Sequence, residues 1–256
     1  VVLRFEGLNT CAAISLNDEL LGRTSNMFEA AEFEVKNRVK AGKNRLAVAF
    51  TPPTGTVCPD GFRSQASVGG VAAQPISPTA GIWRGVSLLA FSGVRVRDVL
   101  IRQDFSGSGG VGLDVAVTAE RFDPALHVEV LVRICYKGNI LHEARDLLAA
   151  DRTVLRLTVK NPQLWWPAAL GDQPLYEVTV DVLAGRTCLE HVSRRIGLRL
   201  FTAERAEENG KPVVRFYINR HPLFLKGASW MPADLYVARL TRVEYARLVK
   251  AAAVAN

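Results

Sequence analysis

The sequence lacks a long apolar run and a cluster of basic residues, and each absence excludes a class of protein. No run of about 18 apolar residues occurs, so we expect no membrane-spanning helix and no membrane partner. The net charge is +7, but the longest basic run is the pair Arg194-Arg195 and no recognition motif accompanies it. Dispersed charge of this kind predicts no nucleic-acid partner.

Cysteine is also scarce, and the four cysteines have no metal-site spacing. They lie far apart and none forms a C-x-x-C pair, so we expect no metal site and isolated buried or free thiols at Cys11, Cys58, Cys135 and Cys188. A charged leader and a starting methionine are missing as well. Because the opening "VVLRFEGL" reads as a strand already in progress, we expect a piece of a longer polypeptide, and the compartment stays open.

Hydrophobic residues make up 48% of the 256 residues and charged residues 22%, so the chain can bury a sizeable core in two or three domains. Residues 1–92 contain short strand-like runs separated by turns, with an Asn-Asp hairpin turn at Asn17 and Asp18. A long loop rich in proline interrupts them from Thr51 to Thr79, and long loops in compact domains are usually functional or mobile. A strand then resumes at "GIWRGVSLLAF".

Residues 93–200 contain six or seven strand-like runs at intervals of roughly ten residues, which is typical of an immunoglobulin-like sandwich. In "HVEVLVRI", Val128, Val130 and Val132 share one face. After residue 200 the pattern changes to a hairpin, a strand and then a helix over residues 241–255. Thr241 and Glu244 form the capping box of that helix. A strand followed by an amphipathic helix is how a βα repeat begins.

One stretch, "NPQLWWPAALGDQPLY", raises a separate question, because two of the four tryptophans are adjacent in it. Neighbours on a strand point to opposite faces, so one of Trp165 and Trp166 must face away from the core. That ring either packs under another domain or faces a ligand.

Several short motifs occur in one order along the chain: "FEGLNTCAAISLNDELLGRTSNMF", "GIWRGV", "LWWPAALGDQPLY", "RRIGLR" and "FYINRHPLFLKGASWMPAD". This series resembles the β-mannosidases of the β-galactosidase-like clan of retaining glycosidases, glycoside hydrolase family 2. The resemblance covers nearly the whole chain, and it is the ordered set, more than any single motif, that is specific.

The resemblance implies a mainly β fold in three parts. Residues 1–92 would form a sugar-binding-type, jelly-roll-like β-sandwich, residues 93–200 an immunoglobulin-like β-sandwich, and residues 201–256 the incomplete start of a (β/α)8 catalytic barrel. A barrel needs about 250 residues, so the two catalytic glutamates would lie further on. The exposed pair Glu207 and Glu208 before a turn glycine is no substitute, and this fragment alone is expected to be inactive, with no cofactor. For Trp165 and Trp166 the resemblance implies a structural join, with direct sugar stacking as the alternative.

The resemblance also implies sugar-binding positions. Trp230, at the end of the presumed first barrel strand, either stacks on a pyranose ring or closes the barrel rim. Ser229 stands where relatives have Asn, and Asp234 binds a hydroxyl or caps the next segment. Counting back from Gly81, the family's Trp-Asp-Trp motif falls on Val71, Ala72 and Ala73. Ala72 would occupy the position of the family's aspartate, which leaves the sugar pocket degenerate.

The expected partner is a β-mannoside oligosaccharide. A non-catalytic carbohydrate-binding or interaction module, a pseudoenzyme, is the alternative, and β-galactosidase or β-glucuronidase specificity is a third reading. Relatives include lysosomal and secreted enzymes, whereas the sequence leaves oligomeric state open.

Overall fold

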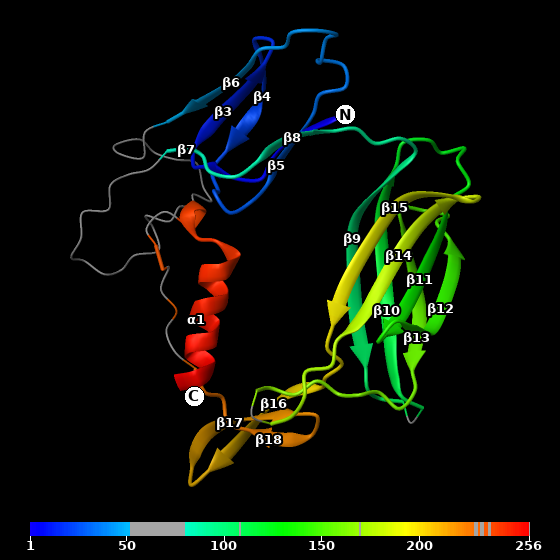
Figure 1. The fold of residues 1–256 in the computed structure, drawn as a ribbon, viewed down its shortest axis with the longest axis vertical. Helices are drawn as coiled ribbons and strands as arrows, with labels where there is room; N and C mark the ends of the chain where they lie inside the picture. Colours follow the sequence, from blue (N-terminus) through cyan, green and yellow to red (C-terminus); the bar gives the residue numbers. More distant parts are fainter. Residues whose placement is uncertain are drawn as a thin grey trace, which may run out of the picture. The chain divides into compact units, whose positions relative to one another are not determined.

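The computed structural model describes residues 1–51, 80–107, 109–168, 170–227, 230, 233–234 and 237–255. Within these residues the chain is mainly β, with eighteen strands, one 3-10 helix and one α-helix (Figure 1). It divides into two compact units, Val1–Phe91 with Pro232–Val249, and Ser92–Met231 with Lys250–Asn256. No described helix is long and apolar enough to cross a membrane.

The first unit contains a small β-sandwich. Its sheets have the strand orders β5-β1-β8, β4-β3-β6 and β2-β7. Leu3 and Phe5 from the first sheet meet Ile14 and Leu16 from the second in one buried core, which is why alternate residues of these strands are apolar. The strands are β1 (Val2–Phe5), β2 (Leu8–Asn9), β3 (Ala12–Leu16), β4 (Glu19–Thr24), β5 (Ala31–Glu34), β6 (Leu46–Phe50), β7 (Gly81–Ile82) and β8 (Val86–Leu89).

The predicted hairpin turn is confirmed. Asn17 and Asp18 both have positive φ, 52° and 67°, which is the geometry of the tight turn that joins two antiparallel strands. The sequence predicts one strand in "VVLRFEGL" and one in "GIWRGVSLLAF". Each run instead forms two strands, β1 and β2 in the first and β7 and β8 in the second. Strand β5, which pairs with β1, has no counterpart in the prediction.

The second unit contains a seven-stranded sandwich, as the spacing of turns predicts. One sheet has the order β13-β10-β9 and the other β12-β11-β14-β15 (Figure 1). This is an immunoglobulin-like arrangement. Its fourth strand, β12, pairs with the third, β11, and does not belong to the sheet that contains the first strand, β9. The strands are β9 (Val94–Asp104), β10 (Val111–Arg121), β11 (Glu129–Tyr136), β12 (Asn139–Leu147), β13 (Arg152–Val159), β14 (Tyr176–Ala184) and β15 (Thr187–Ile196).

Alternation of apolar and polar residues explains the core of this sandwich. Val128, Val130 and Val132 are buried as predicted, and β13 alternates exposed and buried residues along its whole length. The sequence pattern did not predict strand β12. Nearly all of its residues are exposed, so neither face of the strand carries an apolar pattern. It pairs with β11 at the edge of its sheet.

A three-stranded sheet follows the sandwich within the same unit. It consists of β16 (Phe201–Glu208), β17 (Lys211–Ile218) and β18 (His221–Leu223). The predicted hairpin is the pair β17 and β18, and β16 adds a strand that the sequence pattern did not indicate. Asn209 and Gly210, both with positive φ, make the turn between β16 and β17.

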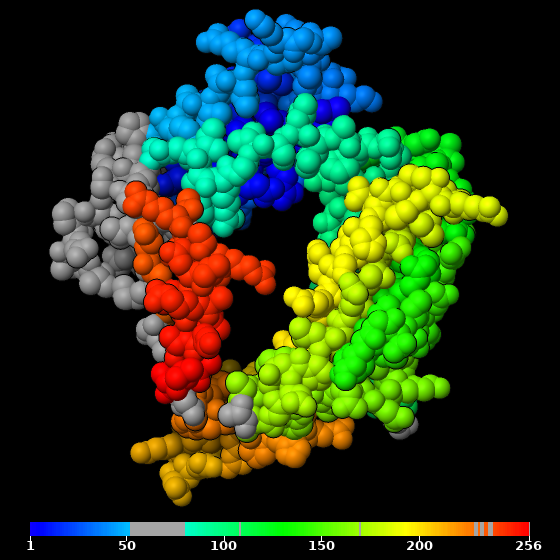
Figure 2. Space-filling model, in the orientation of Figure 1, coloured from blue at the N-terminus to red at the C-terminus, as the bar shows by residue number. Residues whose placement is uncertain are grey.

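Residues after Leu223 include the 3-10 helix η2 (Val237–Arg239) and the helix α1 (Arg242–Ala255), whose start and end agree with the prediction. The capping box is also confirmed, because the Thr241 amide donates to Glu244 (2.7 Å) and the Glu244 amide donates to the Thr241 hydroxyl (3.4 Å). No described residue of α1 is buried, and its side chains are visible along the helix in the space-filling view (Figure 2). The described residues 224–227 and 230 form no strand, so the barrel strand expected there stays a prediction.

The cysteines require one correction. Cys11 is disulfide-bonded, so the prediction of isolated thiols is wrong at this position. The absence of short C-x-x-C spacing gave no sign of this bond, since a disulfide needs closeness in space and not along the chain. Cys135 and Cys188 are free thiols, as expected. Cys58 lies outside the described residues.

Candidate functional site

The acidic pair considered in the sequence lies at the tip of the β16–β17 hairpin. Glu207 and Glu208 are exposed at the β16–β17 hairpin, and Glu208 forms an ion pair with Arg215. A solvated tip of this kind is the structure the sequence predicts. Among the described residues, no group of three or more His, Cys, Asp or Glu side chains is placed to hold a metal ion.

Two of the six sugar-binding positions predicted from the sequence lie within the described residues. Trp230 is 56% exposed and belongs to the second compact unit, whereas Asp234 is half-buried and belongs to the first. The others lie outside the described residues: Val71, Ala72, Ala73 and Ser229.

The Glu244 carboxylate in the cap of α1 has a shifted pKa, to which the charge of Asp234 contributes. The pKa of Glu244 is lowered from its ordinary value of 4.5, first by the hydrogen bond from the Thr241 amide and then by the one from the Thr241 hydroxyl. The carboxylate of Asp234 opposes this shift weakly. Glu244 is thus held ionised at the first turn of α1, where a negative charge also stabilises the helix.

Two of the sequence motifs meet at Trp83 in the first unit. Its indole Nε1 donates to the Met27 carbonyl (2.8 Å), and Phe28 packs edge-on against its ring at 6.2 Å between centroids. Gly7 lies against the same ring, because a Cβ there would be 2.4 Å from Nε1. The guanidinium of Arg84 lies 4.0 Å from the ring centroid. Trp83 therefore joins the start, the middle and the end of the first sandwich.

Trp165 makes the corresponding joint in the second unit. Its amide donates to the Leu198 carbonyl (2.8 Å), and a Cβ on Gly197 would lie 2.7 Å from its ring. The Arg199 guanidinium lies 4.9 Å from the ring centroid on the same stretch of chain. The motif "LWWP" therefore packs on the motif "RRIGLR", and Trp165 is structural.

Two amide side chains fix the segment between β15 and β16. Gln103, at the end of β9, donates to the Gly197 carbonyl (3.1 Å) and accepts from the Arg199 amide (3.0 Å). Because its carboxamide serves as donor and acceptor at once, Gln103 holds both ends of a three-residue stretch.

Asn219 acts on the same segment from the other side. It is only 9% exposed, and its carboxamide accepts from the Leu200 amide (3.0 Å) and donates to the Trp165 carbonyl (3.1 Å). Its own amide donates to the Leu200 carbonyl (2.7 Å). The turn of the β17–β18 hairpin is thereby tied to the sandwich through Trp165.

Trp166 faces a different neighbourhood. Its ring packs edge-on against His221 of β18 at 5.3 Å between centroids, and Gly171 lies within contact of it. The Trp166 amide donates to the Asp172 carbonyl (2.9 Å), and Gln173 donates to the carbonyls of Trp166 and Gly171. Trp166 and Gln173 thus close a loop between them, and the two adjacent tryptophans contact different parts of the unit.

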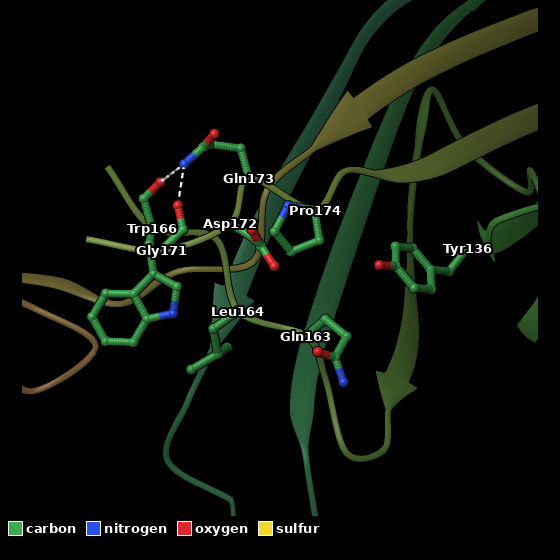
Figure 3. Close-up of a pocket in the computed structure, with 8 residues that line it drawn as sticks. All are labelled: Tyr136, Gln163, Leu164, Trp166, Gly171, Asp172, Gln173 and Pro174. Atoms are coloured by element: carbon green, nitrogen blue, oxygen red, sulfur yellow. Dashed lines mark hydrogen bonds between the residues drawn. The ribbon is translucent and has the colours of Figure 1, made fainter. Parts of the chain in front are cut away.

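This loop forms one wall of a cavity of about 460 Å³ (Figure 3). Trp166 and Tyr136 lie on opposite sides of it in the figure, with the remaining lining residues between them: Gln163, Leu164, Gly171, Asp172, Gln173 and Pro174. The sequence drew attention only to Trp166 in this site, because Tyr136 and the loop come together only in the folded sandwich.

The far wall of the cavity is fixed by a pair of tyrosines. The ring of Tyr136 stacks on Tyr176 at 4.7 Å between centroids with an interplanar angle of 25°. The Tyr176 hydroxyl accepts from the Gln163 amide (2.8 Å). Burial raises the pKa of Tyr176, and the hydrogen bond from Gln163 opposes that shift. Tyr176 therefore stays a neutral phenol that orients both Tyr136 and the start of the loop.

The described fold and side chains define a tandem β-sandwich protein whose tryptophans act as joints within each unit. A model described as "Glycosyl hydrolase 2 galactose-binding domain-like" matches residues 1–84, and the model "Glycosyl hydrolases family 2" matches residues 94–199. The chain belongs to glycosyl hydrolases family 2, and its likeness within that family is to β-mannosidases.

The individual relatives agree with this assignment. Beta-mannosidase B of Aspergillus niger is 26% identical over 98% of this chain, and that of Thermothelomyces thermophilus is 28% identical over 100% of it. The crystal structure of a beta-D-mannosidase from Dictyoglomus thermophilum matches 98% of this chain with a TM-score of 0.84 and 31% identity. An Amycolatopsis orientalis exo-chitosanase shares the fold at 21% identity and a TM-score of 0.71 over 97% of this chain.

The present chain spans about a third of these relatives. It covers 32% of the length of the two fungal β-mannosidases, 33% of the Dictyoglomus enzyme and 29% of the exo-chitosanase. The matched region corresponds to the sandwiches and the segment that follows them.

Proposed function

We propose that this chain is the amino-terminal part of a retaining exo-glycosidase that hydrolyses terminal β-linked mannose. The observation that carries the proposal is the match to the Dictyoglomus β-D-mannosidase over 98% of this chain but only 33% of that enzyme. Retaining hydrolysis needs two carboxylates about 5 Å apart across the sugar. In this proposal both glutamates lie beyond residue 256, and the described residues support them without taking part in bond cleavage.

The proposed division of labour follows the domain order expected from the sequence. Residues 1–92 form a sugar-binding-type, jelly-roll-like sandwich, residues 93–200 form the immunoglobulin-like sandwich, and residues 201–256 begin the (β/α)8 barrel. Helix α1 supports the last assignment, because it has a complete capping box but no buried residue among those described. A capped helix with exposed Val243 and Val249 gains stability only when further elements cover it.

The experiment is to obtain the coding sequence that follows residue 256 and to assay the intact protein. We expect an Asn-Glu pair and a second glutamate on later barrel strands. The intact protein should release nitrophenol from p-nitrophenyl β-mannoside faster than from the β-galactoside or the β-glucuronide. Replacing either glutamate by glutamine should abolish release, while folding is monitored by circular dichroism. Absence of the glutamates, or preference for another glycoside, would refute the proposal.

The sugar-binding positions stay part of the proposal. Trp230 would stack on the sugar, with Ser229 and Asp234 as polar neighbours. Ala72 would stand where the family aspartate holds sugar hydroxyls. Hydrogen bonds to charged groups contribute about 1.5–3 kcal/mol, which corresponds to at least about tenfold in rate. Restoring Trp-Asp-Trp at residues 71–73 of the intact protein should therefore raise kcat/KM on a β-mannoside at least about tenfold.

The single variant Ala72→Asp should recover only part of this gain in kcat/KM, because in the triple variant the flanking rings also hold the loop. An unchanged kcat/KM in the triple variant would mean that residues 71–73 do not contact the sugar. A non-catalytic module remains the second candidate, favoured by the alanine at position 72. It requires that the intact protein bind β-mannosides without hydrolysing them.

A further inference from the structure

The cavity beside Trp166 contains polar groups that have no partner among the described residues. The carboxylate of Asp172, the hydroxyl of Tyr136 and the side-chain amide of Gln163 line it, yet none of the three takes part in a hydrogen bond or ion pair there. Asp172 and Gln163 engage the protein only through their backbone groups. The three groups are therefore available to a ligand.

The walls that carry these groups are held in place before any ligand arrives. Trp166 is held in place by its contacts with His221 and Gly171. Tyr136 is fixed by its stacking on Tyr176, so that its hydroxyl is oriented by the ring beneath it. A preorganised wall reduces the entropy lost on binding, which is the condition for useful affinity in a small site.

The chemistry of the lining selects a neutral polyol. The carboxylate of Asp172 accepts hydrogen bonds, whereas the Tyr136 hydroxyl and the Gln163 amide both donate and accept. Sugar hydroxyls also donate and accept, and the indole of Trp166 provides an apolar surface for the ring carbons. No Lys, Arg or His is among the residues that line the cavity, where Asp172 is the charged group, and the nearby Lys137 lies over the Tyr136 ring at 5.3 Å from its centroid. One carboxylate is too few ligands for a calcium or magnesium ion.

We propose that this cavity is a binding site for a neutral saccharide. Its volume of about 460 Å³ lies within the range of small-molecule sites. The inference rests on the proposed function only for the choice of probe, which is β-1,4-mannobiose.

The test is nuclear magnetic resonance titration of the 256-residue chain, labelled with nitrogen-15, with β-1,4-mannobiose at millimolar concentrations. Cellobiose is the second neutral probe and inorganic phosphate the anionic one. We expect saturable shifts of the Trp166 indole signal and of the backbone amides of Gly171 and Asp172 with a neutral disaccharide. Phosphate should leave these signals unchanged.

Three variants make the result specific. Asp172→Asn removes the charged acceptor and should weaken binding about tenfold, and Tyr136→Phe should weaken it by removing only the hydroxyl. Asp98→Asn is the matched control, because Asp98 is an exposed carboxylate on β9 of the same sandwich and lies outside the cavity lining. The spectra also report whether each variant is folded.

The proposal is overturned if neither disaccharide shifts the cavity signals, if phosphate shifts them equally, or if Asp172→Asn binds as tightly as the parent chain. None of these results bears on hydrolysis by the intact protein. Conversely, failure of the nitrophenyl β-mannoside assay would leave the saccharide titration unaffected, so the two proposals fail separately.

Discussion

Replacing Asn219 by alanine tests whether one side chain ties the β16–β18 sheet to the immunoglobulin-like sandwich. Asn219 has a φ of 50° and its carboxamide bonds the Leu200 amide and the Trp165 carbonyl. Asn209 is a matched control, because it has a φ of 53° in the neighbouring hairpin turn and is exposed. Alanine in a left-handed conformation costs about 1 kcal/mol in both variants. Only Asn219→Ala also leaves two partly buried backbone groups without partners.

The expected destabilisation in Asn219→Ala follows from those two backbone groups. An unsatisfied polar group costs about 1–3 kcal/mol when buried. The Leu200 amide and the Trp165 carbonyl are only partly buried, so we take a total loss of about 2 kcal/mol in the free energy of local opening as a conservative expectation. This corresponds to roughly a 30-fold change in an equilibrium constant. The assay is hydrogen exchange of single amides by nuclear magnetic resonance, read at the Trp165 amide, which bonds Leu198 and not Asn219 itself.

We expect the Trp165 amide to exchange about 30-fold faster in Asn219→Ala and at its parent rate in Asn209→Ala. Asn219→Asp should lie between them, because it keeps the acceptor for Leu200 and loses the donor to Trp165. If both alanine variants changed Trp165 exchange equally, the backbone conformation alone would explain the effect. The reasoning about the side chain would then be wrong.

Two further predictions concern the first unit and the helix cap. Gly7→Ala would place a methyl group 2.4 Å from Trp83 Nε1 and should lower the free energy of unfolding by about 1–3 kcal/mol in urea. Gly85→Ala, with open space around the new methyl group, should change it little, and equal effects would contradict the clash. Glu244, whose pKa is lowered in the folded chain, should stabilise the first turn of α1 above its ordinary pKa of 4.5 and lose this effect as the pH falls through the folded value. Exchange of the α1 amides, corrected for intrinsic rates, should then accelerate with acid, and an identical acceleration in Glu244→Gln would exclude the cap as its cause.

Local patterns predicted those parts of the fold that depend on local interactions. The hairpin turn at Asn17, the buried face of Val128 and Val130, and the capping box at Thr241 all follow from neighbours in the sequence. Strand β12 could not be predicted in this way, because its stability comes from pairing with β11 and not from an apolar face of its own.

The candidate site was less accessible to sequence reasoning than the fold. The cavity exists because Tyr136 at the end of β11 faces the loop that contains Asp172, and no spacing rule connects these two positions. Trp165 and Trp166 were recognisable as unusual, but their separate partners depend on contacts with Gly197 and His221. Trp230 and Asp234 were selected by resemblance alone, and their roles stay predictions.

The contact between Gly7 and Trp83 has an evolutionary consequence. A side chain at position 7 destabilises this sandwich unless the indole at position 83 is replaced by a smaller side chain, so the two positions should vary together among homologues. Gly197 and Trp165 form a second pair of the same kind. Selection on these pairs acts through folding, and it persists after an active site has decayed. Such motifs therefore identify the lineage of a chain and can survive unchanged in descendants that no longer cleave sugars.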